Sequence, residues 1–252
     1  MLSPDGRYLA VAARKLELWN AADLSTSATL WSPDQGAPDP IPDSWPTDAL
    51  SLQYSGAVAI SPDGATIADG LYGGRVRLWD PRTGRRIAEF SEGMGRGKVN
   101  GLAFTADGSR LAASFSAPIE GAPKGAVIVW DVAGQKPVFD SEVSTGAVAF
   151  RHDGLLCAST VNGVVFLGSS GAEVGKALAA TPNVMAMNKE GTRLALRTRH
   201  DDNVVQLWDV DQLKVLRDFR AADSVYALAF DATSSKIAVG NESGSVEVWS
   251  AA

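Results

Sequence analysis

Residues able to do catalytic or metal chemistry are few in this chain and widely spaced. His152 and His200 are the two histidines, and Cys157 is the single cysteine. The strand order expected below places the two histidines at opposite ends of the sheets, so they cannot ligate one metal ion or complete one catalytic triad. Cys157 falls inside an expected strand, as a small core residue. The spacing therefore predicts no metal site and no nucleophile.

Two further groups fail as sites for phosphate or cations. Residues 93–99, Gly-Met-Gly-Arg-Gly-Lys-Val, contain a Gly-Lys pair, but the phosphate-loop pattern requires glycine where Glu92 stands and Ser or Thr where Val99 stands. Asp201 and Asp202 provide two adjacent carboxylates, which are too few to enclose a cation. We therefore expect a chain that is not an enzyme and that binds no cofactor.

The composition is that of a folded chain with an acidic balance of charge. Of its 252 residues, 45% are hydrophobic and 21% are charged, with a net charge of −6 and a pI near 5.0. Binding to a nucleic-acid backbone needs clustered Lys and Arg, so we expect no nucleic-acid partner. No apolar run approaches the roughly 20 residues of a membrane helix, and the first residues lack the pattern of a signal peptide. We expect no membrane association and a cytoplasmic location.

One sequence plan recurs six times along the chain. Each copy has a turn, a short apolar strand, a second turn and an alternating strand that ends in a large apolar residue. The copies are SPDGRYLAVAARKLELWN (3–20), SPDGATIADGLYGGRVRLWD (61–80), TADGSRLAASFSAPIEGAPKGAVIVWD (105–131), RHDGLLCASTVNGVVFLGS (151–169), NKEGTRLALRTRHDDNVVQLWD (188–209) and DATSSKIAVGNESGSVEVWS (231–250). Leu167 closes the alternating strand of the fourth copy, and tryptophans close the others: Trp19, Trp79, Trp130, Trp208 and Trp249.

The local patterns favour four antiparallel strands in each repeat, which we name a to d in chain order. RVRLW, VVQLW and SVEVW alternate polar and apolar residues, as half-buried strands do. Segments ahead of the turns, such as GAVAI and YALAF, are apolar and small, as expected of strands buried on both faces. In Ser-Pro-Asp-Gly, proline presets the turn and glycine accepts the left-handed conformation that ends it.

These units resemble WD40 repeats, with Trp-Asp pairs at 79–80, 130–131 and 208–209. The resemblance covers nearly the whole chain and implies an all-β fold, a β-propeller of about six four-stranded blades. No copy has the Gly-His dipeptide typical of that family. Its usual buried hydrogen-bond network therefore cannot form, and stability should rest mainly on apolar packing. TolB-like propellers share the Ser-Pro-Asp-Gly turn, but their repeats match the RVRLWD strands less well.

The spacing of the closing residues locates two insertions. These residues are separated by 60, 51, 37, 41 and 41 positions, against a repeat unit of about 41. The excess in the first interval lies in the proline-rich segment at 33–54, and the excess in the second lies at 116–125. Both insertions interrupt a continuous repeat array, so we predict a single domain over 1–252.

The repeat count leaves about two strands missing. The residues before Trp19 and after Trp249 amount to about half a unit. By their order, the missing strands are the inner strand a of the first unit and the outer strand d of the last. We expect an upstream segment, fused to this chain or removed from it, to complete them. A truncated seven-blade propeller is the alternative.

Antiparallel order predicts which connections lie together. The d-to-a and b-to-c connections fall at one end of every sheet, and the a-to-b and c-to-d turns fall at the other. Both insertions belong to the first end, as do 91–98 and 197–203. Long loops on a rigid scaffold are common binding sites, and Trp and Arg often anchor interfaces. The candidate contact residues are Trp31, Trp45, Arg96, Lys98, Arg199 and His200.

Structural roles are the alternatives for these residues. Trp31 could end strand d of the first unit and pack on its neighbour, Trp45 could cover an apolar patch, and the charged candidates could be solvated. The sequence predicts a non-catalytic scaffold that binds a protein or peptide through this end of the sheets. The alternative functions are a sensor or regulatory domain of a larger protein, and a small-ligand or enzyme site at the mouth of the propeller channel.

Overall fold

A computed structural model of the chain describes residues 1, 7–12, 16–23, 25–31, 55–71, 73–93, 96–115, 126–143, 146–160, 162–175, 178, 184–198, 201–231 and 233–251. These residues form strands, turns and loops, and none of them lies in a helix. They group into two compact units, Met1–Glu142 and Val143–Ala252. The expected single domain over 1–252 stays a prediction.

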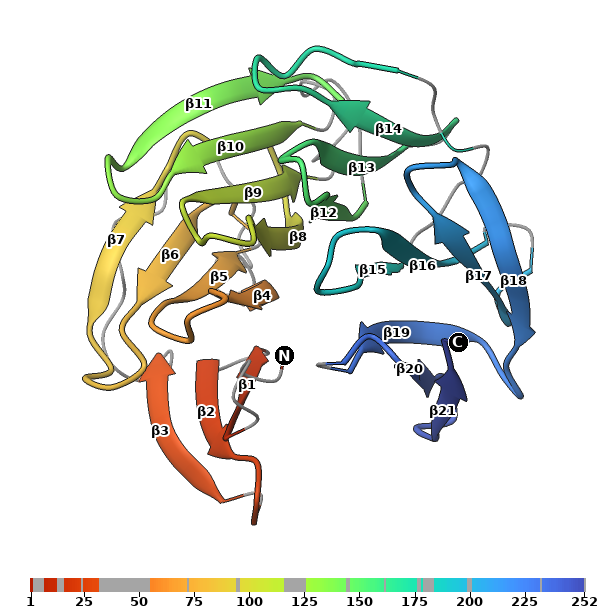
Figure 1. Ribbon diagram of the computed structural model, residues 1–252. Helices are drawn as coiled ribbons and strands as arrows, with labels where there is room; N and C mark the ends of the chain where they lie inside the picture. The colour runs from red at the N-terminus through yellow and green to blue at the C-terminus, as the bar shows by residue number, and fades with distance from the viewer. Residues whose placement is uncertain are drawn as a thin grey trace. The chain divides into compact units, whose positions relative to one another are not determined.

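The first unit contains three antiparallel sheets. Their strands are β1 (Tyr8–Ala12), β2 (Leu16–Asn20) and β3 (Thr26–Trp31), then β4 (Ser55–Ile60), β5 (Ile67–Leu71), β6 (Val76–Trp79) and β7 (Arg86–Phe90), then β8 (Val99–Phe104), β9 (Arg110–Phe115), β10 (Val127–Asp131) and β11 (Lys136–Ser141). The strand orders are β1-β2-β3, β4-β5-β6-β7 and β11-β10-β9-β8 (Figure 1). Each sheet is therefore a meander in which consecutive strands pair.

The second unit repeats this plan. Its strands are β12 (Val148–Phe150), β13 (Leu156–Thr160) and β14 (Gly163–Leu167), then β15 (Met185–Met187), β16 (Arg193–Arg197), β17 (Val204–Asp209) and β18 (Lys214–Arg220), then β19 (Val225–Phe230), β20 (Lys236–Asn241) and β21 (Val246–Ser250). The orders are β12-β13-β14, β15-β16-β17-β18 and β19-β20-β21.

The sheets confirm the prediction of an all-β chain built from antiparallel repeats of strands a to d. Three sheets show all four strands within the described residues. The first sheet begins with strand b, which is β1, and the last sheet ends with strand c, which is β21. Within the described residues, the first sheet therefore has no strand a and the last sheet has no strand d. The repeat count left these two positions open.

The outer strand of the fourth repeat is described only in part. Beyond β14, the described residues form two antiparallel bridges to that strand, Val164 to Leu178 and Leu167 to Glu173, while residues 176–177 and 179–183 lie outside the described part. Gly171 and Gly175 have φ angles of 79° and 74°. Gly171 lies in the turn that connects β14 to this segment, where a left-handed glycine is common.

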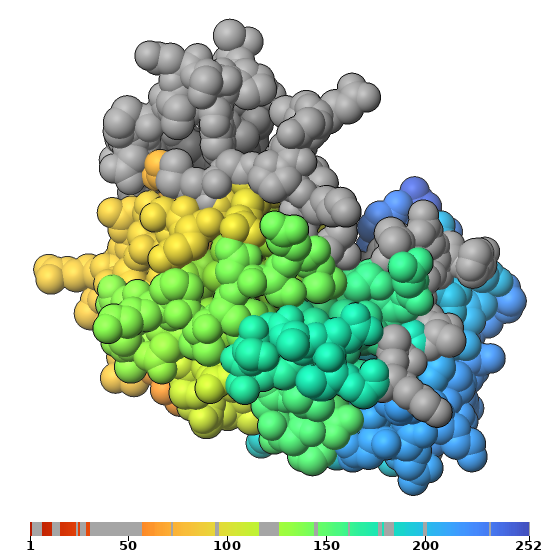
Figure 2. Space-filling view, turned by 90° about the horizontal axis from the view of Figure 1, so that it is seen from above, coloured from red at the N-terminus to blue at the C-terminus, as the bar shows by residue number. Residues whose placement is uncertain are grey.

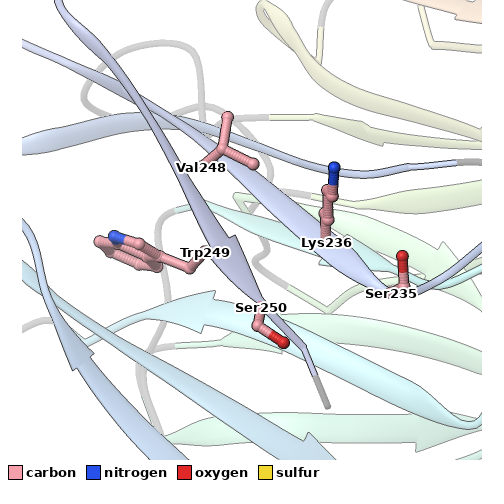
Figure 3. A pocket seen from close by; sticks show the side chains of 5 residues that line it. All are labelled: Ser235, Lys236, Val248, Trp249 and Ser250. Carbon is pink, nitrogen blue, oxygen red and sulfur yellow. The ribbon is translucent and has the colours of Figure 1, made fainter.

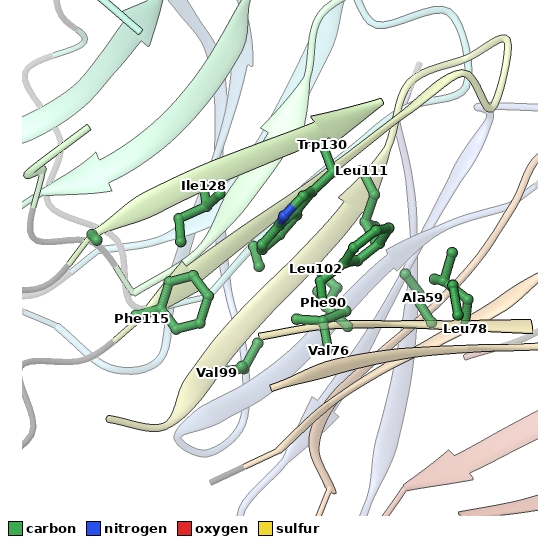
Figure 4. Packing of buried hydrophobic residues seen from close by; sticks show 14 residues of the cluster. Ala59, Val76, Leu78, Phe90, Val99, Leu102, Leu111, Phe115, Ile128 and Trp130 are labelled. Carbon is green, nitrogen blue, oxygen red and sulfur yellow. The ribbon is translucent and has the colours of Figure 1, made fainter. Parts of the chain in front are cut away.

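The cores lie between successive sheets of a unit. Between the sheets β4–β7 and β8–β11, Phe90 stacks on Trp130 with ring centroids 5.0 Å apart and an angle of 10° (Figure 4). Trp130 is fully buried, and burying a large apolar side chain stabilises the fold by about 1.5–3 kcal/mol. In the space-filling view the orange-to-yellow part of this unit lies directly beside its green part, in agreement with that packing (Figure 2).

Hydroxyl and carboxylate side chains fix the turns between strands a and b. Thr105 donates its Oγ1 hydrogen to Asp107 at 2.6 Å, and the backbone N–H of Ser109 donates to the same carboxylate at 3.0 Å. These hydrogen bonds lower the pKa of Asp107 from 3.8 to about 2. Gly108, the last turn residue, has a φ of 72°, and Gly64 has a φ of 69°, which confirms the left-handed conformation predicted for the glycine of Ser-Pro-Asp-Gly.

One sheet contains a buried polar network that the sequence analysis did not predict. Asp69 on β5 accepts hydrogen bonds from Nε and Nη2 of Arg77 at 3.1 and 2.5 Å and from Nε1 of Trp79 at 2.7 Å. The side chains of Asp69 and Arg77 are 0% and 1% exposed. The expectation that stability rests mainly on apolar packing is therefore incomplete for this sheet.

Candidate functional site

In the first unit, the β5–β6 turn and the β7–β8 connection lie against each other at one end of the sheets. A Cβ built on Gly74 would stand 2.0 Å from the carbonyl oxygen of Gly93, and one built on Gly93 would stand 2.2 Å from Cε1 of Phe115. The turn joins strands b and c, and the connection joins d to the next a. Both kinds of connection thus meet at one end of these sheets, as antiparallel order requires.

Arg96, in the β7–β8 connection, forms a two-pronged ion pair with Asp140 of β11. Its Nη1 and Nη2 donate to the two carboxylate oxygens at 2.8 and 2.5 Å. The side chains are 24% and 41% exposed, so the pair lies at the surface and contributes at most about 1 kcal/mol. Lys98 of the same connection is half-buried and makes a contact of its own. Arg96 and Lys98 therefore already interact with other residues of the chain. The sequence did not indicate these interactions.

Of the other four predicted contact residues, the structure describes the backbone of one and leaves three outside the described residues. Trp31 is the last residue of β3, where its backbone pairs with Leu16. Its role as a contact residue stays a prediction. Trp45, Arg199 and His200 lie outside the described residues, as do the insertions 33–54 and 116–125.

In the second unit, three connections are joined by backbone hydrogen bonds. The amide of Val225 donates to Asp202 at 2.8 Å, the amide of Ala221 donates to Asn203 at 2.8 Å, and the amide of Glu242 donates to Ser224 at 2.9 Å. These bonds link the β16–β17, β18–β19 and β20–β21 connections. The b-to-c and d-to-a connections therefore form one ordered end of this unit.

At this end, Tyr226 and Arg197 form a cation–π pair. The guanidinium carbon of Arg197 lies 5.9 Å from the centroid of the Tyr226 ring. Arg197 Nη1 donates to the carbonyl oxygen of Val225 at 2.9 Å and lies 3.7 Å from Oδ1 of Asp202. Arg197 is 8% exposed, its Nε is buried without a hydrogen-bond partner, and Tyr226 is 60% exposed. A buried cation thus orients an exposed aromatic ring.

The sequence analysis missed Tyr226 because it expected the YALAF segment to be buried on both faces. In the structure, Tyr226 and Ala227 of β19 are exposed. Within the second unit, the sheet β19–β21 packs its other face on β15–β18, through residues such as Ile237 and Val239. A tyrosine among small apolar residues has a hydroxyl group that favours contact with water. This hydroxyl is the signal that could have indicated an exposed position.

The described residues offer little for catalysis. Burial raises the pKa of Cys157 to about 12, so its thiol stays protonated. His152 lies 3.3 Å from Asp211 in a surface turn. Within the described part of the chain, no three His, Cys, Asp or Glu residues are placed to hold a metal ion. No helix of that part is long and apolar enough to cross a membrane.

Comparison with known proteins gives two matches. Residues 213–250 match the family model described as WD domain, G-beta repeat. This match runs from β18 through β21, so the sequence repeat begins with strand d of one sheet and continues into the next.

The chain is also similar to the small ribosomal subunit protein RACK1 of Brassica napus, with 25% identity over 157 residues. The aligned part covers 62% of this chain and 39% of that protein. The repeated four-stranded sheets, the closing tryptophans and both matches support the resemblance to WD40 repeats, and residues 213–250 are similar to one such repeat.

Proposed function

We propose that this chain is a non-catalytic scaffold that binds a protein or peptide through the end of its sheets that carries the d-to-a and b-to-c connections. The observation that supports the proposal best is the pair of Tyr226 and Arg197. Tyr is among the residues that most often anchor protein interfaces. A ring that Arg197 already orients loses little further freedom when a partner packs on it, and this favours affinity.

The anchored connections of the first unit support the same role. Arg96 is oriented by Asp140, and the β7–β8 connection is held through Gly93. The candidates outside the described residues remain part of the proposal: Trp45, Arg199 and His200. Trp31 and Lys98 are proposed contacts as well. The relative in Brassica napus is, by its name, a component of the small ribosomal subunit, and a place in a larger assembly suits the scaffold proposed here.

The location that we propose is the cytoplasm. Cys157 is the single cysteine, so the fold needs no intrachain disulfide and suits a reducing compartment.

The proposal is tested by capture from a lysate of the source organism with three forms of the chain, quantified by mass spectrometry. We expect the unchanged chain to retain a specific protein that Tyr226→Ala loses by at least about tenfold, which corresponds to about 1.4 kcal/mol. Leu216→Ala is the matched control, because Leu216 is 45% exposed on the outer strand β18 of the same unit. Equal retention by Tyr226→Ala, or equal loss with Leu216→Ala, would contradict this binding end.

A further inference from the structure

Arg197 departs from the other repeats at its position in strand b. That position lies three residues after the one that pairs with the closing residue of strand c, as Leu194 pairs with Trp208. The other repeats have small residues there: Ala12, Gly70, Ser114, Ser159 and Gly240. A Cβ built on Gly70 would stand 2.3 Å from Cγ1 of Val99 on the next sheet. The position therefore faces the neighbouring strand a, and the fifth repeat places a long cationic side chain there.

Tyr226 departs from the repeats in the same way. The register of β19 skips Tyr226, which is therefore the extra residue of a bulge. Bulges at the corresponding places of β4 and β8 have Gly56 and Asn100 as their extra residues. Such bulges redirect a side chain. The two departures meet, because the Arg197 guanidinium lies 5.9 Å from the centroid of the Tyr226 ring.

Arg197 lacks the close counter-charge that the other buried arginine has. Among the described residues the buried arginines are Arg77 and Arg197. Arg77 donates from Nε and Nη2 to one carboxylate, at 3.1 and 2.5 Å. Arg197 donates from Nη1 to a backbone carbonyl, its Nε has no partner, and the carboxylate oxygen paired with it, Oδ1 of Asp202, lies 3.7 Å away. That distance is too long for a hydrogen bond, and a buried charge is costly until it is paired and hydrogen-bonded.

The other carboxylates near this end are already engaged. Asp201 pairs with Arg220 at 3.0 Å. Asp223 accepts hydrogen bonds from two backbone amides, at 2.7 and 3.2 Å. Glu247 accepts hydrogen bonds from a backbone amide at 2.9 Å and from a side-chain amide at 2.7 Å.

Asp202 is a loose partner that another carboxylate can replace. Its side chain is 59% exposed, and within the described residues no hydrogen bond holds its carboxylate. Turning toward water would open the Arg197 guanidinium to an incoming anion. Every Asp and Glu of the second unit lies among the described residues, so a firm counter-charge for Arg197 comes from outside this unit.

A cavity of the second unit lies apart from this site. Its volume is about 380 Å³. The residues that line it are Ser235, Lys236, Val248, Trp249 and Ser250 (Figure 3). Lys236 pairs with Ser250 at one end of β20, whereas Asn241 pairs with Val225 at the other end. Arg197 binds the carbonyl of Val225, so its site is at the end of the sheet away from that cavity.

We propose that Arg197 selects protein partners with an acidic side chain, which pairs with the guanidinium while the Tyr226 ring packs on the same segment of the partner. Guanidinium and carboxylate groups form short, charge-assisted hydrogen bonds with defined geometry, and such pairs give an interface its specificity. This role of Arg197 rests on the proposed function, because it names the chemistry of the partner that the Tyr226 end binds.

The test uses the full chain and random peptides displayed on phage. We expect the unchanged chain to enrich peptides with Asp or Glu at one fixed place, and Arg197→Gln to enrich peptides without that preference. Gln is the matched change, since its side-chain amide can still donate to the carbonyl of Val225. The peptide that binds best is then synthesised in two forms, one with its acidic residue and one with the corresponding amide residue.

Isothermal titration calorimetry with both peptides separates charge from contact. We expect the unchanged chain to bind the acidic form at least about tenfold more tightly than the amide form, and Arg197→Gln to bring this ratio to about one. Tyr226→Ala should weaken both forms and leave the ratio unchanged. Asp202→Asn should raise the affinity for the acidic form about two- to fivefold, because it removes a like charge. Asp218→Asn, on β18, is its control and should leave that affinity unchanged.

The results distinguish the role of Arg197 from the proposed function as a whole. Enrichment by the unchanged chain of peptides without an acidic preference would overturn this role and leave the proposed function standing. No enrichment by any form would contradict the proposed function, and this role with it. A ratio that persists in Arg197→Gln, shown to be folded by circular dichroism, would assign the carboxylate to another cation.

A segment of this chain is the remaining alternative occupant. Residues 33–48 contain four aspartates. If deleting them raises the affinity for the acidic peptide about tenfold or more, the chain's own segment holds Arg197 and the role in partner selection is wrong. If Arg197→Gln does not fold, the ratio measured with the unchanged chain and the effect of Asp202→Asn still decide.

Discussion

The indole N–H of each closing tryptophan donates a hydrogen bond to a side-chain acceptor. How much this hydrogen bond contributes to stability depends on how deeply the acceptor is buried. Trp19, Trp208 and Trp249 each donate to the residue two positions earlier in the same strand, at 3.1, 3.1 and 3.2 Å. Trp79 instead donates to Asp69, which also binds Arg77 and is fully buried. The first kind of contact is partly exposed to solvent, whereas the second belongs to a buried network in which Arg77 neutralises the charge of Asp69.

Replacing Asp69 with Ala is predicted to destabilise the chain strongly. The change would leave the Arg77 guanidinium buried without its counter-charge, and such losses cost about 3–5 kcal/mol. Glu17→Ala is the matched control, because it removes a tryptophan acceptor at a half-buried position and should cost no more than about 1.5 kcal/mol. The free energy of unfolding in urea measures both. Similar losses for the two variants would mean that the buried pair has no special role.

The turn carboxylates predict how stability changes in acid. The hydroxyl of Thr105 and the amide of Ser109 lower the pKa of Asp107 to about 2, below its ordinary value of 3.8. A depressed pKa in the folded state means that the ionised form is stabilised by folding, so this contribution is present above about pH 4 and is lost as the pH falls toward 2. Asp63 and Asp231 occupy comparable turns, and hydrogen bonds from Ser61 and Thr233 respectively lower their pKa values.

We therefore expect the thermal midpoint to fall between pH 4 and pH 2, and Asp107→Asn to reduce that dependence. The amide oxygen of Asn can still accept the Ser109 N–H, so the variant should fold. Asp218→Asn, on the outer strand β18 away from the turns, is the control and should leave the dependence unchanged. Calorimetry across this pH range measures the effect. An unchanged slope in Asp107→Asn would assign the acid sensitivity to other groups.

The β7–β8 connection packs closely on its neighbours at Gly93. A Cβ at this position would stand 2.2 Å from Phe115 and 2.4 Å from the carbonyl oxygen of Gly74. We predict that Gly93→Ala lowers the free energy of unfolding by about 1–3 kcal/mol, as overpacking does. Gly240→Ala is the control, since its Cβ would meet Ala227 at 3.4 Å. Denaturant unfolding compares them, and equal stability would mean that the connection moves aside readily.

The strands were predictable because their signals are local. Alternating apolar residues, tight turns and closing tryptophans recur in the same order in each repeat, and they identify β6, β17 and β21 directly. The outer strand of the fourth repeat stays a prediction, because residues 176–177 and 179–183 lie outside the described part of the chain. Contacts between distant residues, such as Arg96 with Asp140 or Arg197 with Tyr226, depend on which strands become neighbours. No local pattern contains that information.

At the scale of the whole chain, the repeat arithmetic gave the order of the strands but not the roles of the insertions. The closing residues place the excess length at 33–54 and 116–125, and β3 ends at Trp31 while β4 begins at Ser55. A repeat array can accept such insertions because they fall between strands, where an added residue removes no pairing. The length of an insertion therefore says little about stability.

Deleting residues 33–48 should accordingly leave the fold intact. The remaining residues between Trp31 and Ser55 can still span about 25 Å when extended, and shortening a loop to about a third of its length changes its closure entropy by only about 1 kcal/mol. We expect the thermal midpoint to change by no more than about 4 °C, as it should for a deletion of 118–123 in the second insertion. If both deletions are tolerated but only the first weakens capture of the partner found with the unchanged chain, the proline-rich segment belongs to the binding end. A large loss of stability from the first deletion alone would instead make that segment a structural cover, and Trp45 part of it.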